Sequence, residues 1–86
     1  MSTLKIVYFA WIRERTGTDE ETLDLPEQVV TPKGLMEWLI QKDERYAYAF
    51  EDCDNVRVAL DQEHVEHDQP LAGASEIAFF PPMTGG

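Results

Sequence analysis

The alternation of hydrophobic and polar positions divides the chain into short strands around one amphipathic helix. The first run is apolar and aromatic, with Lys5 as its single interruption, which is typical of a central strand with both faces buried. A later segment places Leu23 and Leu25 on one face, as in a half-exposed strand. These patterns predict a strand at 4–10, a helical turn at 11–16 ended by Gly17, a polar connector at 18–21, and a strand at 22–25 that ends before Pro26.

The longest amphipathic segment begins at Thr31 and Pro32. A hydroxyl that can cap a helix, followed by proline at the first helical position, is a strong start signal. The residues after it recur at helical spacing, which predicts one main helix with a buried stripe. The stripe consists of Leu35, Trp38, Leu39 and Lys42, with Met36 and Ile40 beside it. A helix-prone stretch at 43–50 continues or restarts this helix and adds Tyr46 and Phe50 to the core.

The second half of the chain returns to strand-like patterns. Val56, Val58 and Leu60 alternate with Arg57 and Ala59, which indicates a strand with one exposed face. The remaining predicted elements are a turn at 51–55, a turn at 61–62, a short returning strand at 63–65, a loop at 67–75, and a final strand at 76–80.

The order of these elements predicts an α+β fold with a mixed sheet of four to five strands packed on one main helix. Because the helix crosses between two strand pairs, and the first and last runs are both apolar, these two runs are expected to pair in parallel at the centre. This is the β-grasp, or ubiquitin-like, architecture. The expected division is a β-grasp domain at residues 1–80 and an extended tail at 81–86 that ends in Gly-Gly.

The tail carries the strongest candidate chemistry. Pro81 and Pro82 have no backbone N–H to donate, so they end the sheet ladder and favour a stiff, extended exit. Gly85 and Gly86 have no Cβ, so they pass through gaps that block other residues. Residues 81–86 reach at most about 20 Å, enough to enter a cleft of another protein. Two terminal glycines also arise by chance or from cloning, but here they come shortly after an apolar strand and a proline pair.

Composition narrows the classes of partner. The formal net charge of −10 argues against nucleic acid and anionic membranes, whose phosphates repel an acidic protein. An acidic surface steers a protein toward basic partners, although it equally serves solubility. The sequence shows neither a signal peptide nor an apolar stretch long enough to span a bilayer. The single Cys53 suits a reducing compartment, so we expect a cytoplasmic protein.

Two other candidate sites are weak. His64 and His67 lie among carboxylates on a predicted turn without a thiolate, so they form at best an adventitious metal site, and no functional metal is expected. Cys53 is flanked by Glu51, Asp52 and Asp54, whose charges disfavour the reactive thiolate. Because the sequence also contains no glycine-rich phosphate loop and no Ser-His-Asp set, its chemistry must be completed by a partner.

Both ends of the chain resemble the small subunit of molybdopterin synthase. At the C-terminus the resemblance rests on Ile77-Ala78-Phe79-Phe80-Pro81-Pro82-Met83-Thr84-Gly85-Gly86. At the N-terminus it rests on Val7-Tyr8-Phe9-Ala10 and on Ile12-Arg13-Glu14-Arg15-Thr16-Gly17. Length and element order also agree, so the likeness covers essentially the whole chain.

A carboxylate is a poor electrophile and must be activated before it can accept sulfur. Attack on the α-phosphate of ATP gives an acyl-adenylate, which sulfide converts into a thiocarboxylate. The resemblance implies that a ubiquitin-type activating enzyme binds this ATP, so the chain itself binds no cofactor, and that a sulfur donor protein follows. It further implies that the tail enters the large synthase subunit, in a heterotetramer of two small and two large subunits. There it would give sulfur to cyclic pyranopterin monophosphate and build the dithiolene of molybdopterin.

By position, the resemblance assigns a role to each residue of the tail. Gly86 carries the adenylate and then the sulfur, and Gly85 provides clearance. The residues expected to meet the partner are Phe80, Pro81, Pro82, Met83 and Thr84. For Phe80, burial in the chain's own core is an equal alternative to a role as an interface anchor.

The sequence departs from the family pattern in two turns. It has Gly73-Ala74-Ser75-Glu76 where relatives often carry Asp-Gly-Asp-Glu, and Asp61 where a strand-ending Asn is common. Both departures concern turn geometry. Three other functions stay open at this point: a sulfur carrier for the thiazole of thiamine, a protein modifier joined to lysines through Gly86, and a binding module with an inert tail.

Overall fold

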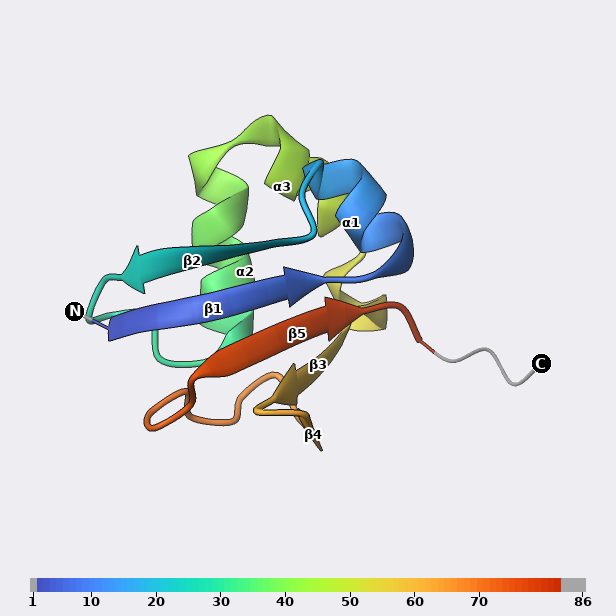
Figure 1. The fold of residues 1–86 in the computed structure, drawn as a ribbon. Coiled ribbons are helices and arrows are strands. Elements are labelled where there is room, and N and C mark those ends of the chain that lie inside the picture. Colours follow the sequence, from blue (N-terminus) through green and yellow to red (C-terminus); the bar gives the residue numbers. More distant parts are fainter. Residues whose placement is uncertain (1, 83–86) are drawn as a thin grey trace.

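The computed structural model describes residues 2–82 as one five-stranded sheet with helices on one side (Figure 1). The strands are β1 (Ser2–Tyr8), β2 (Glu20–Leu25), β3 (Arg57–Leu60), β4 (Glu63–Val65) and β5 (Glu76–Phe80). The helices are α1 (Ala10–Thr16), α2 (Pro32–Lys42), α3 (Glu44–Ala49) and the 3₁₀ turn η1 (Cys53–Asn55). No helix in this part of the chain combines the length and apolarity that crossing a bilayer requires.

The strand order β2-β1-β5-β3-β4 confirms the predicted β-grasp. β1 and β5 pair in parallel at the centre, with Tyr8 opposite Phe79, whereas the other neighbouring strands are antiparallel. A parallel pair needs a long crossover, and here the helical segments between β2 and β3 provide it. The first and last strands therefore lie side by side, although most of the chain separates them in sequence.

The main helix begins where the sequence predicts. The Thr31 hydroxyl accepts a hydrogen bond from the backbone N–H of Gly34 at 3.0 Å, and Pro32 occupies the first turn. The chain then restarts as α3 rather than continuing α2. The Asp43 carboxylate caps this second helix by accepting from the Arg45 N–H at 3.0 Å. Tyr46 and Phe50 enter the core as predicted, each about 1% exposed.

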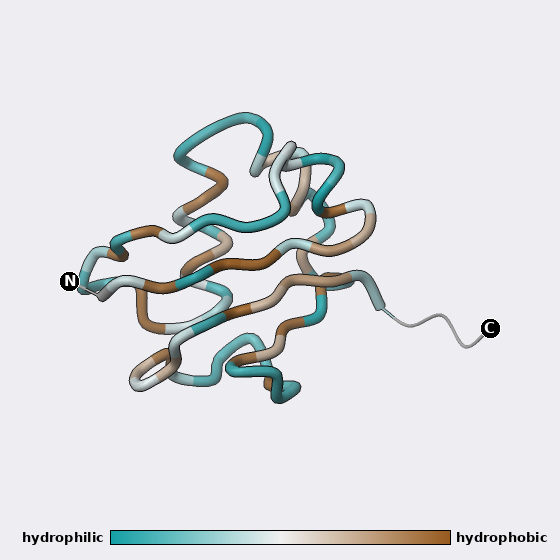
Figure 2. The backbone as a smooth tube through the Cα atoms, in the orientation of Figure 1, coloured by the Kyte–Doolittle hydropathy of each residue, from teal (hydrophilic) through white to brown (hydrophobic). Residues whose placement is uncertain are grey.

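The prediction that both faces of the first strand are buried is wrong. Leu4, Ile6 and Tyr8 point into the core, whereas Thr3 and Lys5 are exposed, because the helices cover only one face of the sheet (Figure 1). The apolar character of this segment therefore led to a prediction of more burial than the strand has. In Figure 2 a brown, hydrophobic stretch lies along the central strand β1, and further brown stretches lie in β5 and in the helical part of the chain.

Several element boundaries also differ from the sequence prediction. β1 ends at Tyr8, and Ala10 already belongs to α1 rather than to the strand. β2 begins at Glu20, inside the segment predicted as a connector. Lys42 is exposed instead of belonging to the buried stripe, and its ammonium lies 5.1 Å from the centre of the Trp38 ring.

The two departures from the family pattern meet at one turn. Asp61 and Gln62, which join β3 to β4, have positive φ values of 49° and 71°. The Asp61 carboxylate accepts hydrogen bonds from the backbone N–H groups of Ser75 and Glu76 at 2.9 and 3.0 Å. Asp61 therefore fixes both its own hairpin and the start of β5, since its acceptor oxygen satisfies the N–H groups that precede the strand.

Candidate functional site

The candidate site begins where β5 ends. Along this strand Ile77 and Phe79 are fully buried under the helices, whereas Phe80 lies on the opposite face and is partly exposed. This excludes the alternative that Phe80 belongs to the core. The strand ends at Phe80, and the two prolines that follow are partly exposed and outside any strand. The other predicted tail residues, Met83, Thr84, Gly85 and Gly86, lie outside the described residues.

The face of the sheet that the helices leave uncovered, here called the open face, carries three rows of side chains across the strands. The strand register defines the rows, since directly opposed residues share a face. The row nearest the tail contains Phe9, Phe80 and Arg57. The middle row contains Glu20, Val7, Ala78, Ala59 and His64. The far row contains Thr22, Lys5 and Glu76.

The row nearest the tail is aromatic. Phe9 is 48% exposed, one of three large hydrophobic residues in residues 2–82 with such exposure. The Phe80 ring meets the His64 ring in an edge-on arrangement, with centroids 5.0 Å apart. Arg57, the register partner of Phe80, is exposed at the other end of the row. Because exposed aromatic and arginine side chains are enriched in interfaces, this row favours contact with another protein.

Backbone geometry holds Phe9 in this row. Its N–H donates to the Phe79 carbonyl at 3.1 Å and continues the parallel ladder past the end of β1. Its carbonyl then accepts from the N–H groups of Ile12 and Arg13, which begins α1. The next residue, Ala10, makes this sharp strand-to-helix turn with φ of 53°, an unusual value for a residue with a Cβ. The turn leaves the Phe9 side chain on the open face.

An aromatic cluster under the sheet supports the root of the tail. The Phe79 ring stacks on Tyr8 at 6.2 Å and meets Phe50 edge-on at 5.0 Å between centroids. All three side chains are at most 1% exposed. A well-packed base of this kind anchors β5 up to its last residue, so the point at which the tail leaves the domain is fixed.

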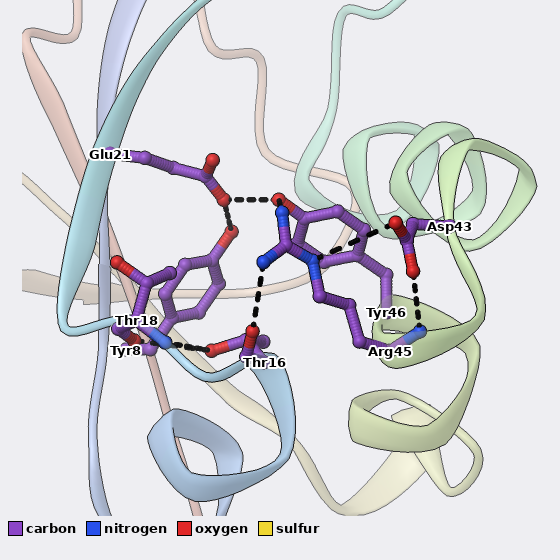
Figure 3. A network of polar contacts seen from close by, with 7 residues as sticks. All are labelled: Tyr8, Thr16, Thr18, Glu21, Asp43, Arg45 and Tyr46. Carbon is purple, nitrogen blue, oxygen red and sulfur yellow. Dashed lines mark hydrogen bonds and ion pairs between the residues drawn. The ribbon is translucent and has the colours of Figure 1, made fainter.

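Beside this cluster, one carboxylate joins three elements (Figure 3). Glu21 Oε2 on β2 accepts a hydrogen bond from the Tyr8 hydroxyl at 2.8 Å and another from the Tyr46 hydroxyl at 2.5 Å. Arg45 extends the network by donating to the Thr16 carbonyl at 3.3 Å, at the end of α1. Sequence reasoning missed this network, because Glu21 is 13 and 25 positions away from its two partners.

Burial dominates the electrostatics of the two tyrosines. Burial, together with the hydrogen bond to the negatively charged Glu21, raises the pKa of Tyr8 far above its ordinary value. The same causes raise the pKa of Tyr46 to about 12. Both phenols therefore remain protonated donors to Glu21 at neutral pH, so the network braces β1, β2 and α3 beneath the site.

Of the candidate residues that sequence analysis set aside, His64 and His67 border the same depression, whereas Cys53 does not line it. His67 Nε2 lies 2.7 Å from the Val56 carbonyl oxygen, while His64 packs on Phe80 at the open face. Within residues 2–82 there is no group of three or more His, Cys, Asp or Glu side chains arranged to hold a metal ion. Cys53 is partly exposed in η1.

Sequence analysis also missed Phe9, Arg57 and His64 as candidate interface residues. Their signal was present in the alternation of the strands, which places Phe80 and Ala78 on the face opposite Ile77 and Phe79. These residues could have been predicted from the alternation by assuming that the helices cover only one face of the sheet.

Comparisons with known proteins agree with this geometry. A model of the ThiS family matches residues 6–86. The molybdopterin synthase sulfur carrier subunit of Escherichia coli is 39% identical over 85 residues, which cover 96% of this chain and 99% of the relative. That of Haemophilus influenzae is 35% identical over 83 residues, with 96% and 99% covered. The structure of a putative molybdopterin converting factor subunit 1 from Pyrococcus furiosus has a TM-score of 0.74 at 28% identity, covering 96% of this chain and all of the other.

Proposed function

Because the chain belongs to the ThiS family, and its curated relatives are molybdopterin synthase sulfur carrier subunits, we propose that it carries sulfur on Gly86 to a molybdopterin synthase. The observation that carries this proposal is the end of β5. A rigid strand stops at Phe80, two prolines follow, and the chain then ends in two glycines. The family match extends through these last residues.

The chemistry begins at the terminal carboxylate. Its oxygen attacks the α-phosphate of ATP held by an activating enzyme, and pyrophosphate leaves, giving an acyl-adenylate on Gly86. Sulfide from a donor protein attacks the acyl carbon and displaces AMP, which leaves a thiocarboxylate. The thiocarboxylate sulfur displaces an oxygen substituent of cyclic pyranopterin monophosphate, and water then cleaves the acyl–sulfur bond and restores the Gly86 carboxylate. Because a dithiolene contains two sulfur atoms, two such transfers build it. ATP is bound by the partner, so the chain itself needs no cofactor.

The domain contributes position rather than catalysis. Its packed face anchors β5, which fixes where the tail starts, and the prolines direct the tail away from the sheet. Because Gly85 has no side chain, the tail is narrow enough there to enter a partner's active site. The expected contacts with that partner are made by Phe80, Pro81, Pro82, Met83 and Thr84, and the aromatic row of the open face extends this surface.

The proposal includes three protein partners. They are the large synthase subunit, in an assembly of two small and two large subunits, the activating enzyme and the sulfur donor. The net charge of −10 fits partners with basic docking surfaces and disfavours nucleic acid. We propose that activation, sulfur loading and sulfur transfer all take place in the cytoplasm.

Reconstitution tests the proposed function. Incubation with the activating enzyme, ATP and a sulfur donor should increase the intact mass by the replacement of one oxygen with sulfur. Adding the large subunit and cyclic pyranopterin monophosphate should reverse the increase and yield molybdopterin. Deleting Gly86 should abolish both steps, because the reacting group is displaced by one residue.

The matched control is Gln41→Ala, an exposed position of α2 that leaves the whole tail intact and should retain sulfur transfer. Stable conjugates to lysines of other proteins would instead indicate a protein modifier, and delivery of sulfur only to thiazole synthesis would indicate the thiamine pathway. An unchanged mass under all conditions would favour the interpretation of the chain as a binding module with an inert tail.

A further inference from the structure

The open face contains a hollow of about 510 Å³ directly behind the aromatic row. Its floor is the cross-strand pair Ala59 and Ala78, two residues that are only 7% and 9% exposed although they lie on the face that the helices leave uncovered. The rest of the lining comes from Phe9 and Phe80, and from Gln62, His64 and Glu76. The hollow exists because two of the smallest side chains lie side by side among much larger ones.

The lining defines what the hollow accepts. Its floor and one wall are alanine methyl groups and phenylalanine rings, and they offer no hydrogen-bond partner to a polar group. Of the two cations beside the lining, Lys5 is already engaged, because its ammonium lies 3.0 Å from Glu20 and 3.9 Å from Glu76, and Arg57 lies beyond Phe80 at the end of the aromatic row. A buried charge would be left unpaired on such a floor, so the hollow favours a bulky apolar group.

The position of the hollow indicates where that group comes from. Ala78 is two residues before Phe80 on the same face of β5, so the floor lies about 7 Å from the aromatic row at ordinary strand rise. A protein that encloses the tail therefore approaches over this surface. The hollow is continuous with the proposed tail contacts, and an apolar depression beside polar rim residues is typical of an interface hot spot.

We propose that the hollow receives one bulky apolar side chain of the large synthase subunit, and that the Ala59–Ala78 pair determines how deeply this side chain seats. The inference rests on the proposed function, because it takes the protein that accepts the tail as the occupant. It adds two specificity-determining residues, Ala59 and Ala78, whose methyl side chains carry no chemistry.

Filling the hollow tests the inference. Ala78→Leu and Ala59→Leu project their new atoms into the open face, so they should occupy the space without disturbing the core. Calorimetric titration with the purified large subunit should show affinity weakened at least about tenfold for each variant, as expected when an interface anchor loses its pocket. Thr22→Leu is the matched control, because Thr22 is exposed on the same face, on the edge strand and outside the hollow, and it should bind like the wild type.

A second variant protects the test against misfolding. Ala59→Ser keeps the depth of the hollow but makes its floor polar, and it should weaken binding by a smaller factor, about two- to fivefold, than the leucine variants. Circular dichroism and thermal melts should show that each variant folds. Sulfur loading by the activating enzyme provides a readout that does not involve the large subunit.

The outcomes separate the inference from the proposed function. Wild-type affinity in both leucine variants and in Ala59→Ser would overturn the hollow as a receptor while leaving the sulfur carrier intact. Weakened docking with normal sulfur loading would support the hollow. Failure of the wild-type protein to bind the large subunit or to gain sulfur would overturn the proposed function, and the inference with it.

Discussion

The two faces of β5 use the same backbone for different purposes. Toward the helices, Ile77 and Phe79 are completely buried and complete the core. Toward the open side, Ala78 and Phe80 form a hollow and an aromatic edge next to the tail. The difference shows how a chain of 86 residues separates stability from recognition, since alternate residues of one strand have different roles. Substitutions on the two faces should therefore have separable effects.

The largest expected effect comes from the buried face. Phe79→Ala should destabilise the protein by about 3–5 kcal/mol, because it removes a fully buried ring and leaves a cavity between Tyr8 and Phe50. Phe80→Ala should cost less than about 1 kcal/mol of stability but weaken binding of the large subunit by about 2 kcal/mol or more. Urea denaturation and titration measure the two quantities. Equal losses of stability in both variants would contradict the separation of the faces.

The carboxylate network comes next. Glu21→Leu should cost about 1–3 kcal/mol, because it removes the acceptor of two buried phenol hydroxyls. Glu21→Gln, which keeps an acceptor oxygen, should lose less. Both variants should bind the large subunit normally once folded, because Glu21 lies on the covered side of β2. Denaturant midpoints measure the stability, and a loss of docking in folded Glu21→Gln would show that the network controls the open face.

The same network predicts how stability depends on alkaline pH. The pKa of Tyr46 rises from 10 to about 12 on folding, and that of Tyr8 also rises, so the folded protein holds these protons more tightly than the unfolded chain. This contribution is fully present below pH 10 and is lost as the pH rises from 10 toward 12. In Tyr46→Phe, the melting temperature should fall less steeply than in the wild type as the pH rises through this range. An unchanged slope in Tyr46→Phe would disprove the linkage.

A smaller effect is expected at the start of α2. Thr31→Ala should cost about 1 kcal/mol, because it removes the side-chain acceptor for the Gly34 N–H, while Thr31→Ser should retain most of the stability. Since α2 packs on the covered face, neither variant should alter docking. Thermal melts and the same titration test both statements, and equal melting temperatures for the alanine variant and the wild type would count against the cap.

The smallest expected effect is a gain in stability. Gln62 adopts φ of 71° in the β3–β4 turn, where glycine is less strained, so Gln62→Gly should stabilise the protein by about 0.5–1 kcal/mol. Gln69→Gly, in a loop position without positive φ, should be neutral or slightly destabilising. A lower melting temperature for Gln62→Gly would show that its side chain at the rim of the hollow also stabilises the fold.

Much of the fold could be predicted because its signals are local. The cap at Thr31, the bounds of β5 and the apolar character of the two central strands were sufficient to place the β-grasp. The open face could not be predicted in the same way, since an apolar run in residues 4–10 does not reveal that only one face is covered. Phe9 reaches that face only because Ala10 adopts a positive φ, and Glu21 meets its tyrosines only after β2 pairs with β1.

For the tail, the sequence alone supports a prediction of its properties. The physical effects of its prolines and glycines follow from their chemistry, because proline lacks a backbone hydrogen-bond donor and glycine lacks a side chain. Which residues surround the start of the tail depends on strand register, because Arg57 is placed there by pairing with Phe80 and His64 by pairing with Ala59.

Fragment mass spectrometry of the sulfur-loaded protein shows which residue carries the transferred sulfur. After incubation with the activating enzyme, ATP and the sulfur donor, we expect the sulfur on the C-terminal residue Gly86, and we expect it to disappear when the large subunit and its substrate are added. Sulfur found on Cys53 as a persulfide, with Gly86 unmodified, would contradict the account.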